Sequence, residues 1–424
     1  MMTVLTLITL LSLSMPFYVY GGYPLVLWVL TRFTKTEIEH QIKKLPSVTL
    51  IISCYNEAGV IARKLENSLA LDYPKDLLTI KAVSDGSNDG TDNIVKGFAD
   101  RGINLIRQEG RLGKTMGLNL AMEQVHSDVV IFSDANAIYA PDSIKHLVNP
   151  FADNNVGYVV GAALYTDGTE SASAQNENLY WRYELAIKAW ESQLHSVVGG
   201  DGAIYAIRRT LWEPLQQRDI NDFVNPLQII AKGYRGRFEP RAKCFEETAG
   251  SFDKEIARKE RIVNRSIRGL MRVSSVMNPL KTGLFSFMVI SHKLLRWLIP
   301  FFLLIGLIGS SILASQSWLL FQFVTAGSIS FTLLACFGLI MQSNPKIPVI
   351  VSLPYYFIMV NGYALKGIAR ALKGNTQVIW SSTRPENKAA GSGEPPKFRL
   401  VIFFSTALIA MAVSLIWPYL SLVG

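Results

Sequence analysis

Cysteine and charged side chains are both scarce in this 424-residue chain. Its three cysteines, Cys54, Cys244 and Cys336, are far apart and odd in number, so they offer neither a disulfide framework nor metal-ligand spacing. Charged residues make up 18% and hydrophobic residues 49% of the chain, which is too apolar for an ordinary soluble enzyme. The formal net charge is +9, but no basic stripe interleaved with aromatic residues stands apart from the apolar runs. A nucleic-acid partner is therefore not expected.

Long apolar runs account for the hydrophobic composition, and they occupy both ends of the chain. Residues 3–30 carry no charge before Arg32, and further apolar runs follow at 298–314, 318–341, 347–364 and 400–421. A run of about 20 apolar residues can cross a bilayer. The first run has no basic segment before it and is too long for a signal peptide, so we expect a retained transmembrane helix over residues 1–32. Residues 286–424 are expected to form a second membrane region.

The basic residues predict the topology. Lys and Arg collect beside the apolar runs. By the positive-inside rule, we expect these flanks and residues 46–250 on the cytosolic side of the plasma membrane. A full crossing at 347–369 would carry the basic segment 366–399 outside. We therefore expect a partial or interfacial helix there, interrupted by Pro354 and Gly362, and a last span at 399–421.

Two segments near the second membrane region are harder to interpret. Residues 251–285 have an amphipathic, basic pattern that suits helices lying on the cytoplasmic face of the membrane. His292, Lys293 and Arg296 follow, and they either line a path through the membrane or are ordinary cytoplasmic flanks, which is the more frequent case.

Residues 46–250 read as an α/β domain. Strands and helices alternate, which predicts a mostly parallel sheet with helices on both faces. Ligands bind such sheets beyond the carboxyl ends of the strands. The expected strands are 47–53, 78–84, 104–107 and 128–133, and the expected helices are 58–71, 91–99 and 114–125. A long helix is also expected over 172–194.

Polar side chains gather at the ends of these predicted strands. Taken alone, the stretch from Asp85 to Thr91 is more often a turn than a site. Asp134 and Asn136 alternate along an extended backbone, so both oxygens can share a divalent cation with phosphate; a turn or helix cap is the competing interpretation. Lys114 lies among glycines that let a diphosphate approach, although the spacing is not that of a Walker loop.

In combination these residues resemble the family 2 glycosyltransferases with the GT-A fold, in the membrane-integrated branch that includes hyaluronan, chitin, cellulose and poly-N-acetylglucosamine synthases. The resemblance covers about residues 46–275 and implies a UDP-sugar donor and Mg²⁺ or Mn²⁺. It also implies a role for each matching residue: nucleoside contacts for Tyr55, Asn56, Glu57 and Asp85, donor-phosphate contact for Lys114, metal binding for Asp134 and Asn136, and general-base catalysis for Asp222, with Asp219 a weaker candidate.

The acceptor side of the resemblance is less regular. It implies acceptor or gating roles for Gly200 and Asp201 in a glycine-rich turn, for Arg258 and Arg261, and for Trp380 and Arg384 in a cytosolic loop over 373–398. The family's Gln-x-x-Arg-Trp box appears here as Arg258-Lys-Glu-Arg261-Ile262. The tryptophan that would stack on the acceptor sugar is missing, and Asn221 stands where the family has an acid before the catalytic aspartate.

Three functions are consistent with this sequence. The first is inverting transfer to a growing polysaccharide, coupled to its passage across the membrane. The second is addition of a single sugar to a lipid-linked acceptor, which the missing tryptophan favours. The third is a non-catalytic scaffold, against which the joint presence of Asp85, Asp134 and Asp222 argues. The sugar, the linkage and the oligomeric state do not follow from the sequence.

Overall fold

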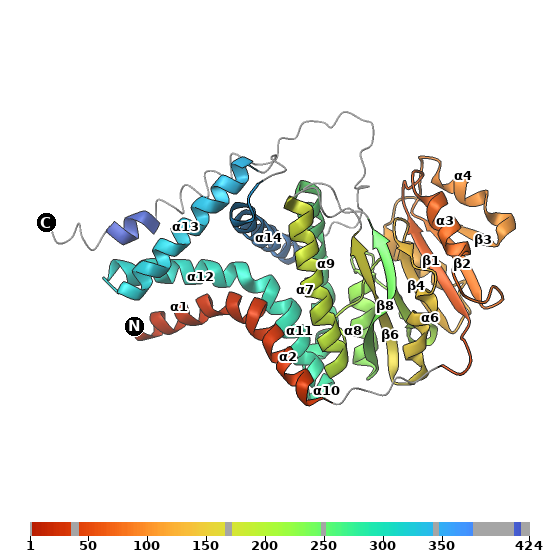
Figure 1. Ribbon diagram of the computed structural model, residues 1–424, viewed down its shortest axis with the longest axis horizontal. Coiled ribbons are helices and arrows are strands. Elements are labelled where there is room, and N and C mark those ends of the chain that lie inside the picture. Colours follow the sequence, from red (N-terminus) through yellow and green to blue (C-terminus); the bar gives the residue numbers. More distant parts are fainter. Residues whose placement is uncertain are drawn as a thin grey trace.

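The structure is a computed structural model that describes residues 2–34, 42–165, 172–246, 252–341, 347–375 and 411–416, with side chains described outside 172–179 and 252–257. One part of the molecule is a sheet covered by helices, and the other is a group of long apolar helices (Figure 1). Helices α7 (Ala172–Leu194) and α9 (Phe252–Arg272) stand between the two parts.

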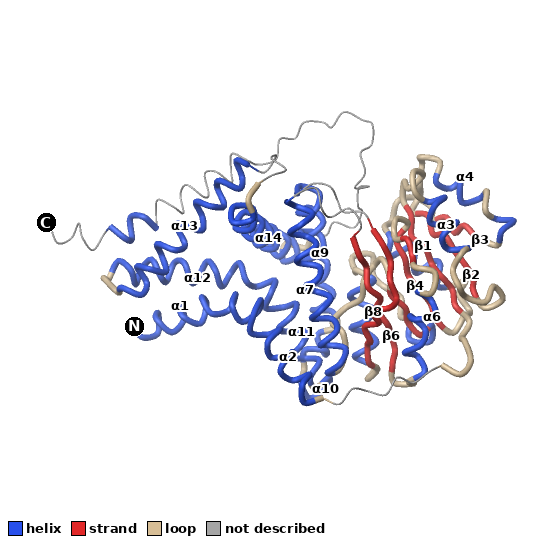
Figure 2. Tube along the Cα trace, in the orientation of Figure 1, coloured by secondary structure: helices blue, strands red, loops and turns tan. Residues whose placement is uncertain are grey.

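The sheet has eight strands in the order β3-β2-β1-β4-β7-β6-β8-β5 (Figure 2). The first four strands along this order are parallel, as the sequence predicts, and β7 and β5 add antiparallel pairings. The strands are β1 (Val48–Cys54), β2 (Leu78–Ser84), β3 (Ile103–Arg107), β4 (Val129–Asp134), β5 (Ile138–Tyr139), β6 (Val156–Tyr165), β7 (Tyr205–Arg208) and β8 (Arg235–Glu246).

Helices cover both faces of the sheet because the strands are apolar on both faces. All seven residues of β1 are buried, and the pleat sends Leu50 and Ile52 into one core and Ile51 into the other. The first core also receives side chains of α3 (Ile61–Leu69), α4 (Thr91–Lys96) and α6 (Ser143–Val148). The second receives those of α5 (Lys114–Met122) and α8 (Asn221–Ala231).

The second core continues into the helices outside the sheet. It includes Ile187 of α7, Leu270 of α9 and Trp297 of α12 (Leu295–Ser315). The short helices α10 (Pro279–Thr282) and α11 (Leu284–Val289) connect α9 to this region. This continuous packing joins the sheet to the apolar helices.

Four helical stretches are long and apolar enough to cross a membrane, which indicates a membrane protein. They are Met2–Phe33 (α1, Met2–Phe17, and α2, Tyr23–Phe33, joined by a π-turn), Leu284–Ser315, α13 (Leu319–Met341) and α14 (Val349–Leu372).

The expected interruption at Pro354 and Gly362 is not found, because α14 runs unbroken through both residues. Neighbouring helices compensate for a proline inside an apolar helix, and Gly362 lies on an open face where no break is needed. In Figure 1, α1 and α12 run across the view whereas α14 is foreshortened, and α14 packs against both α9 and α13. Whether α14 crosses the membrane or lies on it stays a prediction. The predicted last span lies outside the described residues except for 411–416.

Candidate functional site

Asp134 and Lys114 form an ion pair at the carboxyl end of the parallel strands. Asp134 is the last residue of β4 and lies beside Ser53 of β1 in the parallel register. Lys114 begins α5, and its Nζ pairs with Oδ1 of Asp134, whose side chain is 38% exposed. The structure thus brings these two predicted site residues together.

Side chains of α3 hold the loop after Asp134 in place. Lys64, which is fully buried, donates to the carbonyl of Ala137. Asn67 exchanges two 2.9 Å hydrogen bonds with the backbone of Tyr139. These contacts fix the backbone directly after Asn136, which lines the cavity described below.

Asp222 faces the same pair across Gly202. It lies in the first turn of α8, where the helix dipole favours a carboxylate. A Cβ added at Gly202 would lie 3.2 Å from Oδ2 of Asp222 and 3.5 Å from Oδ2 of Asp134. It would also be 3.4 Å from Nζ of Lys114, so the three charged groups meet around a position that only glycine leaves open.

Burial raises the pKa of Asp222 above the usual range of an aspartate. Lys114 opposes this shift, while the carboxylates of Asp201 and Asp134 add to it. The backbone N–H of Gly200 donates to the carbonyl of Asp222, which ties the glycine-rich turn to the start of α8. Asp222 is thus a carboxyl group with a raised proton affinity at the head of a cavity.

The two neighbours of Asp222 in the predicted motif have structural roles. Asn221 is buried and donates to the hydroxyl of Tyr205 over 2.9 Å. Asp219 is 1% exposed, accepts from the backbone N–H of Gln216 and pairs with Arg272 at 2.8 Å. Asp219 does not line the cavity, so the described geometry leaves Asp222 as the better candidate base.

The predicted nucleoside residues divide into two groups. Tyr55 and Glu57 line the cavity, and the guanidinium of Arg111 lies 3.8 Å from the centroid of the Tyr55 ring. Asn56 and Asp85 do not line it. Asn56 has a positive φ of 52° and forms two hydrogen bonds with Asn88, which join the loops after β1 and β2.

Asp85 chiefly holds the loop before α5. Its Oδ1 accepts from the backbone N–H groups of Leu112 (3.0 Å) and Gly113 (2.9 Å) and from Gln108. Burial raises its pKa, against the effect of these hydrogen bonds. Its Oδ2 is buried without a hydrogen-bond partner among the described residues.

A cavity of about 1980 Å³ begins at these side chains and extends between the apolar helices. The predicted acceptor residues Gly200, Asp201, Arg258 and Arg261 all line it. Asp201 pairs with Lys188 of α7 at 3.1 Å, and both side chains are largely buried. Trp380 and Arg384 lie outside the described residues, as does most of the predicted loop 373–398.

Several lining residues were not identified by the sequence analysis as part of the site. Ile262 lines the cavity where the family has a tryptophan, but Trp181 and Trp297 line it too. The ring of Trp297 makes an edge contact with Phe223, next to Asp222, with 5.7 Å between centroids. Because Trp297 comes from a distant helix, sequence spacing gives no signal for it.

Glu246 is a further missed carboxylate. It ends β8 and lines the cavity. Burial raises the pKa of Glu246 to about 8, and the nearby charges of Asp134 and Asp201 add to the shift. The signal that led to Asp134, a carboxylate at the end of a buried strand, also applies to Glu246.

These carboxylates fit a divalent cation only if another ligand contributes. Within the described part of the chain, no three His, Cys, Asp or Glu side chains are grouped to hold a metal. Asp134 and Asn136 supply two oxygens, and Glu246 lines the same cavity. The residues present fit a cation that donor phosphates help to bind.

Comparison with known proteins agrees with this geometry. Residues 49–212 match the model of the family "Glycosyl transferase family 2". This part of the chain is a family 2 glycosyltransferase domain. The chain is 28% identical over 222 residues to "Probable glycosyltransferase YdaM" of Bacillus subtilis, a match that covers 49% of this chain and 52% of that protein. It is 26% identical over 227 residues to "Poly-beta-1,6-N-acetyl-D-glucosamine synthase" of Staphylococcus aureus, covering 51% and 54%.

The fold of the glycosyltransferase domain is the GT-A fold, as the sequence predicts. The structure is similar to that of "Mannosyltransferase PcManGT from Pyrobaculum calidifontis in complex with GDP-Man and Mn2+", with a TM-score of 0.66 at 19% sequence identity. That similarity covers 86% of this chain and 99% of the other. The sequence matches span only about half the length of the two relatives named above.

Proposed function

We propose that this chain is an inverting glycosyltransferase that moves a sugar from a UDP-sugar to an acceptor in the cavity between the glycosyltransferase domain and the membrane. The observation that carries the proposal is the meeting of Asp222, Lys114 and Asp134 around Gly202, at the head of a cavity that continues between apolar helices. The basic flanks of these helices support a cytosolic catalytic domain in the plasma membrane.

Asp222 acts as the general base in this proposal. Its carboxylate takes the proton of the acceptor hydroxyl as the hydroxyl oxygen forms a bond to the anomeric carbon. The bond from that carbon to the diphosphate oxygen breaks, and the nucleoside diphosphate leaves with the electron pair on the opposite face. A raised pKa suits Asp222 to accept a proton, because an ordinary aspartate is a weaker base.

Lys114 and the cation site stabilise the leaving group. The ammonium of Lys114 lies where negative charge would develop on the diphosphate, and a protein cation there lowers the barrier without reorganisation. Asp134 and Asn136 would hold Mg²⁺ or Mn²⁺, which supplies further charge neutralisation to the phosphates when bound. Tyr55 and Glu57 are the lining residues best situated for the nucleoside.

The sequence leaves two acceptor classes, a growing polysaccharide and a lipid-linked acceptor, and the cavity favours the lipid-linked acceptor. A growing polysaccharide is supported by the aromatic lining and by the S. aureus relative whose name describes a polysaccharide synthase. A lipid-linked acceptor is favoured by a specific observation, the aliphatic walls of the cavity between the membrane helices. Sugar hydroxyl groups gain nothing from such walls, whereas a hydrocarbon chain does.

The function is tested with full-length protein in detergent, a panel of UDP- and GDP-sugars, and Mg²⁺ or Mn²⁺. We expect Asp222→Asn to lower turnover by at least about a thousandfold and to leave donor binding near wild type, since the substitution removes the base and keeps the shape. Asp100→Asn, at an exposed position, is the matched control and should behave as wild type. Turnover retained in Asp222→Asn would refute the base assignment.

A further inference from the structure

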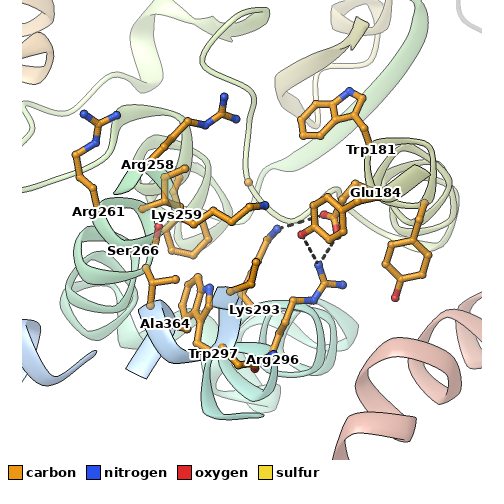
Figure 3. Close-up of a pocket in the computed structure, with 18 of the residues that line it drawn as sticks. Trp181, Glu184, Arg258, Lys259, Arg261, Ser266, Lys293, Arg296, Trp297 and Ala364 are labelled. Carbon is orange, nitrogen blue, oxygen red and sulfur yellow. Dashed lines mark hydrogen bonds and ion pairs between the residues drawn. The ribbon is translucent and has the colours of Figure 1, made fainter. Parts of the chain in front are cut away.

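Three cationic side chains meet where the cavity leaves the glycosyltransferase domain and enters the apolar helices. We call Lys259, Lys293 and Arg296 the basic cluster; all three line the cavity. Tyr180 joins two of them, since its hydroxyl accepts from Arg296 at 3.2 Å and its ring lies 4.6 Å from Nζ of Lys259. Figure 3 shows the Lys259 and Lys293 side chains directed into the same space beside Glu184.

One carboxylate faces this cluster from the lining. Glu184 pairs with Arg296 and lies 3.9 Å from Nζ of Lys293 (Figure 3). The neighbouring Glu191 accepts from Tyr23 (2.6 Å) and from the backbone N–H of Val198 (2.9 Å), and it contacts His292 at 2.6 Å. The three cations of the basic cluster therefore outnumber these two carboxylates among the described side chains.

The charged ends of this cluster suit an anion in the cavity. The Arg296 side chain is 10% exposed, and its guanidinium lies 5.6 Å and 5.8 Å from the ring centroids of Tyr20 and Tyr183. The Lys293 side chain is 22% exposed, and its Nζ lies 3.2 Å from Nε2 of His292. Phosphate oxygens match guanidinium and ammonium donors in charge and geometry.

The cavity changes character on the membrane side of the basic cluster. There it runs between α1, α12, α13 and α14, and most of its lining is apolar; we call Leu13, Phe17, Leu303, Leu307, Val324 and Phe331 the apolar groove. Each of these helices belongs to one of the four candidate spans. A Cβ added at Gly327, which also lines the cavity, would meet nothing within 4 Å, so the groove has open space beside α13.

We propose that the acceptor is a lipid-linked saccharide whose phosphate binds the basic cluster. Its hydrocarbon chain lies in the apolar groove, and its sugar extends past Trp297 toward Asp222. The proposal rests on the proposed function and narrows it, because it names the acceptor class. Charge complementarity selects a phosphate over a neutral glycan, and the adjoining groove selects a lipid-linked phosphate over a free one.

Binding of a phosphate-bearing lipid tests the basic cluster directly. The probe is a 55-carbon polyprenyl monophosphate added to the detergent-solubilised full chain, with affinity read from tryptophan fluorescence. We expect Lys293→Gln and Lys259→Gln each to weaken binding about tenfold, since each removes one charge-assisted hydrogen bond. Lys281→Gln, at an exposed position outside the cavity, is the matched control and should bind as wild type.

Two further binding experiments distinguish the contribution of the hydrocarbon chain from that of the phosphate. A polyprenol of the same length and inorganic phosphate should each bind at least about tenfold more weakly than the polyprenyl phosphate. Gly327→Phe should block the groove and weaken binding of the lipid, whereas Gly362→Phe should not; both glycines are exposed with open space above them, but only Gly327 lines the cavity. Equal binding of inorganic phosphate, or unchanged binding in Lys293→Gln and Gly327→Phe, would overturn the proposal.

Turnover distinguishes failure of this inference from failure of the proposed function. Asp222→Asn should bind the polyprenyl phosphate as wild type does, because that residue acts in chemistry and lies outside the basic cluster. If the wild-type chain converts a UDP-sugar to a polymer with neutral oligosaccharide alone, the proposed function stands and the lipid-linked acceptor is wrong. If lipid binds as described but no nucleotide sugar is turned over, the proposed function fails.

Discussion

Gly202→Ala tests the geometry of the site more sharply than removal of any charged group. The added methyl would lie 3.2 Å from Oδ2 of Asp222, closer than an ordinary van der Waals contact, so the carboxylate must retreat by a few tenths of an ångström. The same methyl would take up space between Lys114 and Asp134, at 3.4 Å and 3.5 Å, where the donor diphosphate must enter.

The expected loss follows from how steeply catalysis depends on position. A displacement of 1 Å costs about a hundredfold in rate, so a displacement of a few tenths together with lost space predicts a fall in kcat/KM of roughly tenfold, or about 1.4 kcal/mol. Gly202→Val, with two more carbons in the same space, should abolish measurable turnover.

Stability should move in the opposite direction in Gly202→Ala. The φ of Gly202 is outside the left-handed region, so alanine adopts the native backbone and reduces the entropy of the unfolded chain, a gain of about 0.4–1 kcal/mol. Gly59→Ala is the matched control: it is exposed, and an added Cβ meets nothing within 4 Å. Both variants should melt at or above the wild-type temperature, and only Gly202→Ala should lose nucleotide release. Wild-type activity in Gly202→Ala would show that the three charged groups do not enclose the reacting diphosphate.

Three other changes probe the rest of the site. Asp134→Ala should weaken Mn²⁺-dependent donor binding about tenfold or more and leave metal-free binding little changed, as titration calorimetry with and without metal would show. The pKa of Glu246 is about 8 in the folded protein and near 4.3 in the unfolded chain. Wild type should therefore lose stability relative to Glu246→Gln as the pH rises from about 4.3 to about 8. Melting temperatures that change with pH in the same way for the two proteins would contradict this. Trp297→Ala should raise the acceptor KM about fivefold by removing a stacking surface worth roughly 1 kcal/mol, and Trp297→Phe should largely restore it.

The strand ends could be predicted because they depend on local patterns. β1 and β2 are continuous apolar runs, and parallel pairing of β1 with β2 and β4 brings their carboxyl ends to one edge. Asp134 and Lys114 therefore meet as the sequence suggests. The described contacts of Asp85 are with backbone N–H groups of the loop before α5, so its predicted nucleoside contact stays a prediction. Spacing alone does not tell a ligand contact from a loop support.

The acceptor side could not be predicted because it is assembled from distant segments. The absence of a tryptophan at position 262 argued against a stacking surface, yet the cavity receives Trp297 from α12 and Trp181 from α7. From the sequence, His292, Lys293 and Arg296 could line a path through the membrane or be ordinary membrane flanks, which is the more frequent case. Only packing distinguishes the alternatives: Lys293 and Arg296 line the cavity, and His292 is fully buried against Glu184 and Glu191.

Helix α7 connects the reaction site to the membrane helices. Glu184, Lys188 and Glu191 are spaced four and three residues apart, so they share one face of the helix. Lys188 pairs with Asp201 in the turn that surrounds Asp222, while the two glutamates contact His292 at 3.1 Å and 2.6 Å. Removing one partner of a buried ion pair costs several kcal/mol. These contacts therefore hold the turn at 199–202 and the start of α12 in a fixed arrangement through the one helix α7. An acceptor that binds the basic cluster, which includes Arg296 of α12, is thereby positioned relative to Asp222. This gives a physical reason for ionic groups to be retained at a boundary where apolar packing alone would hold the helices together.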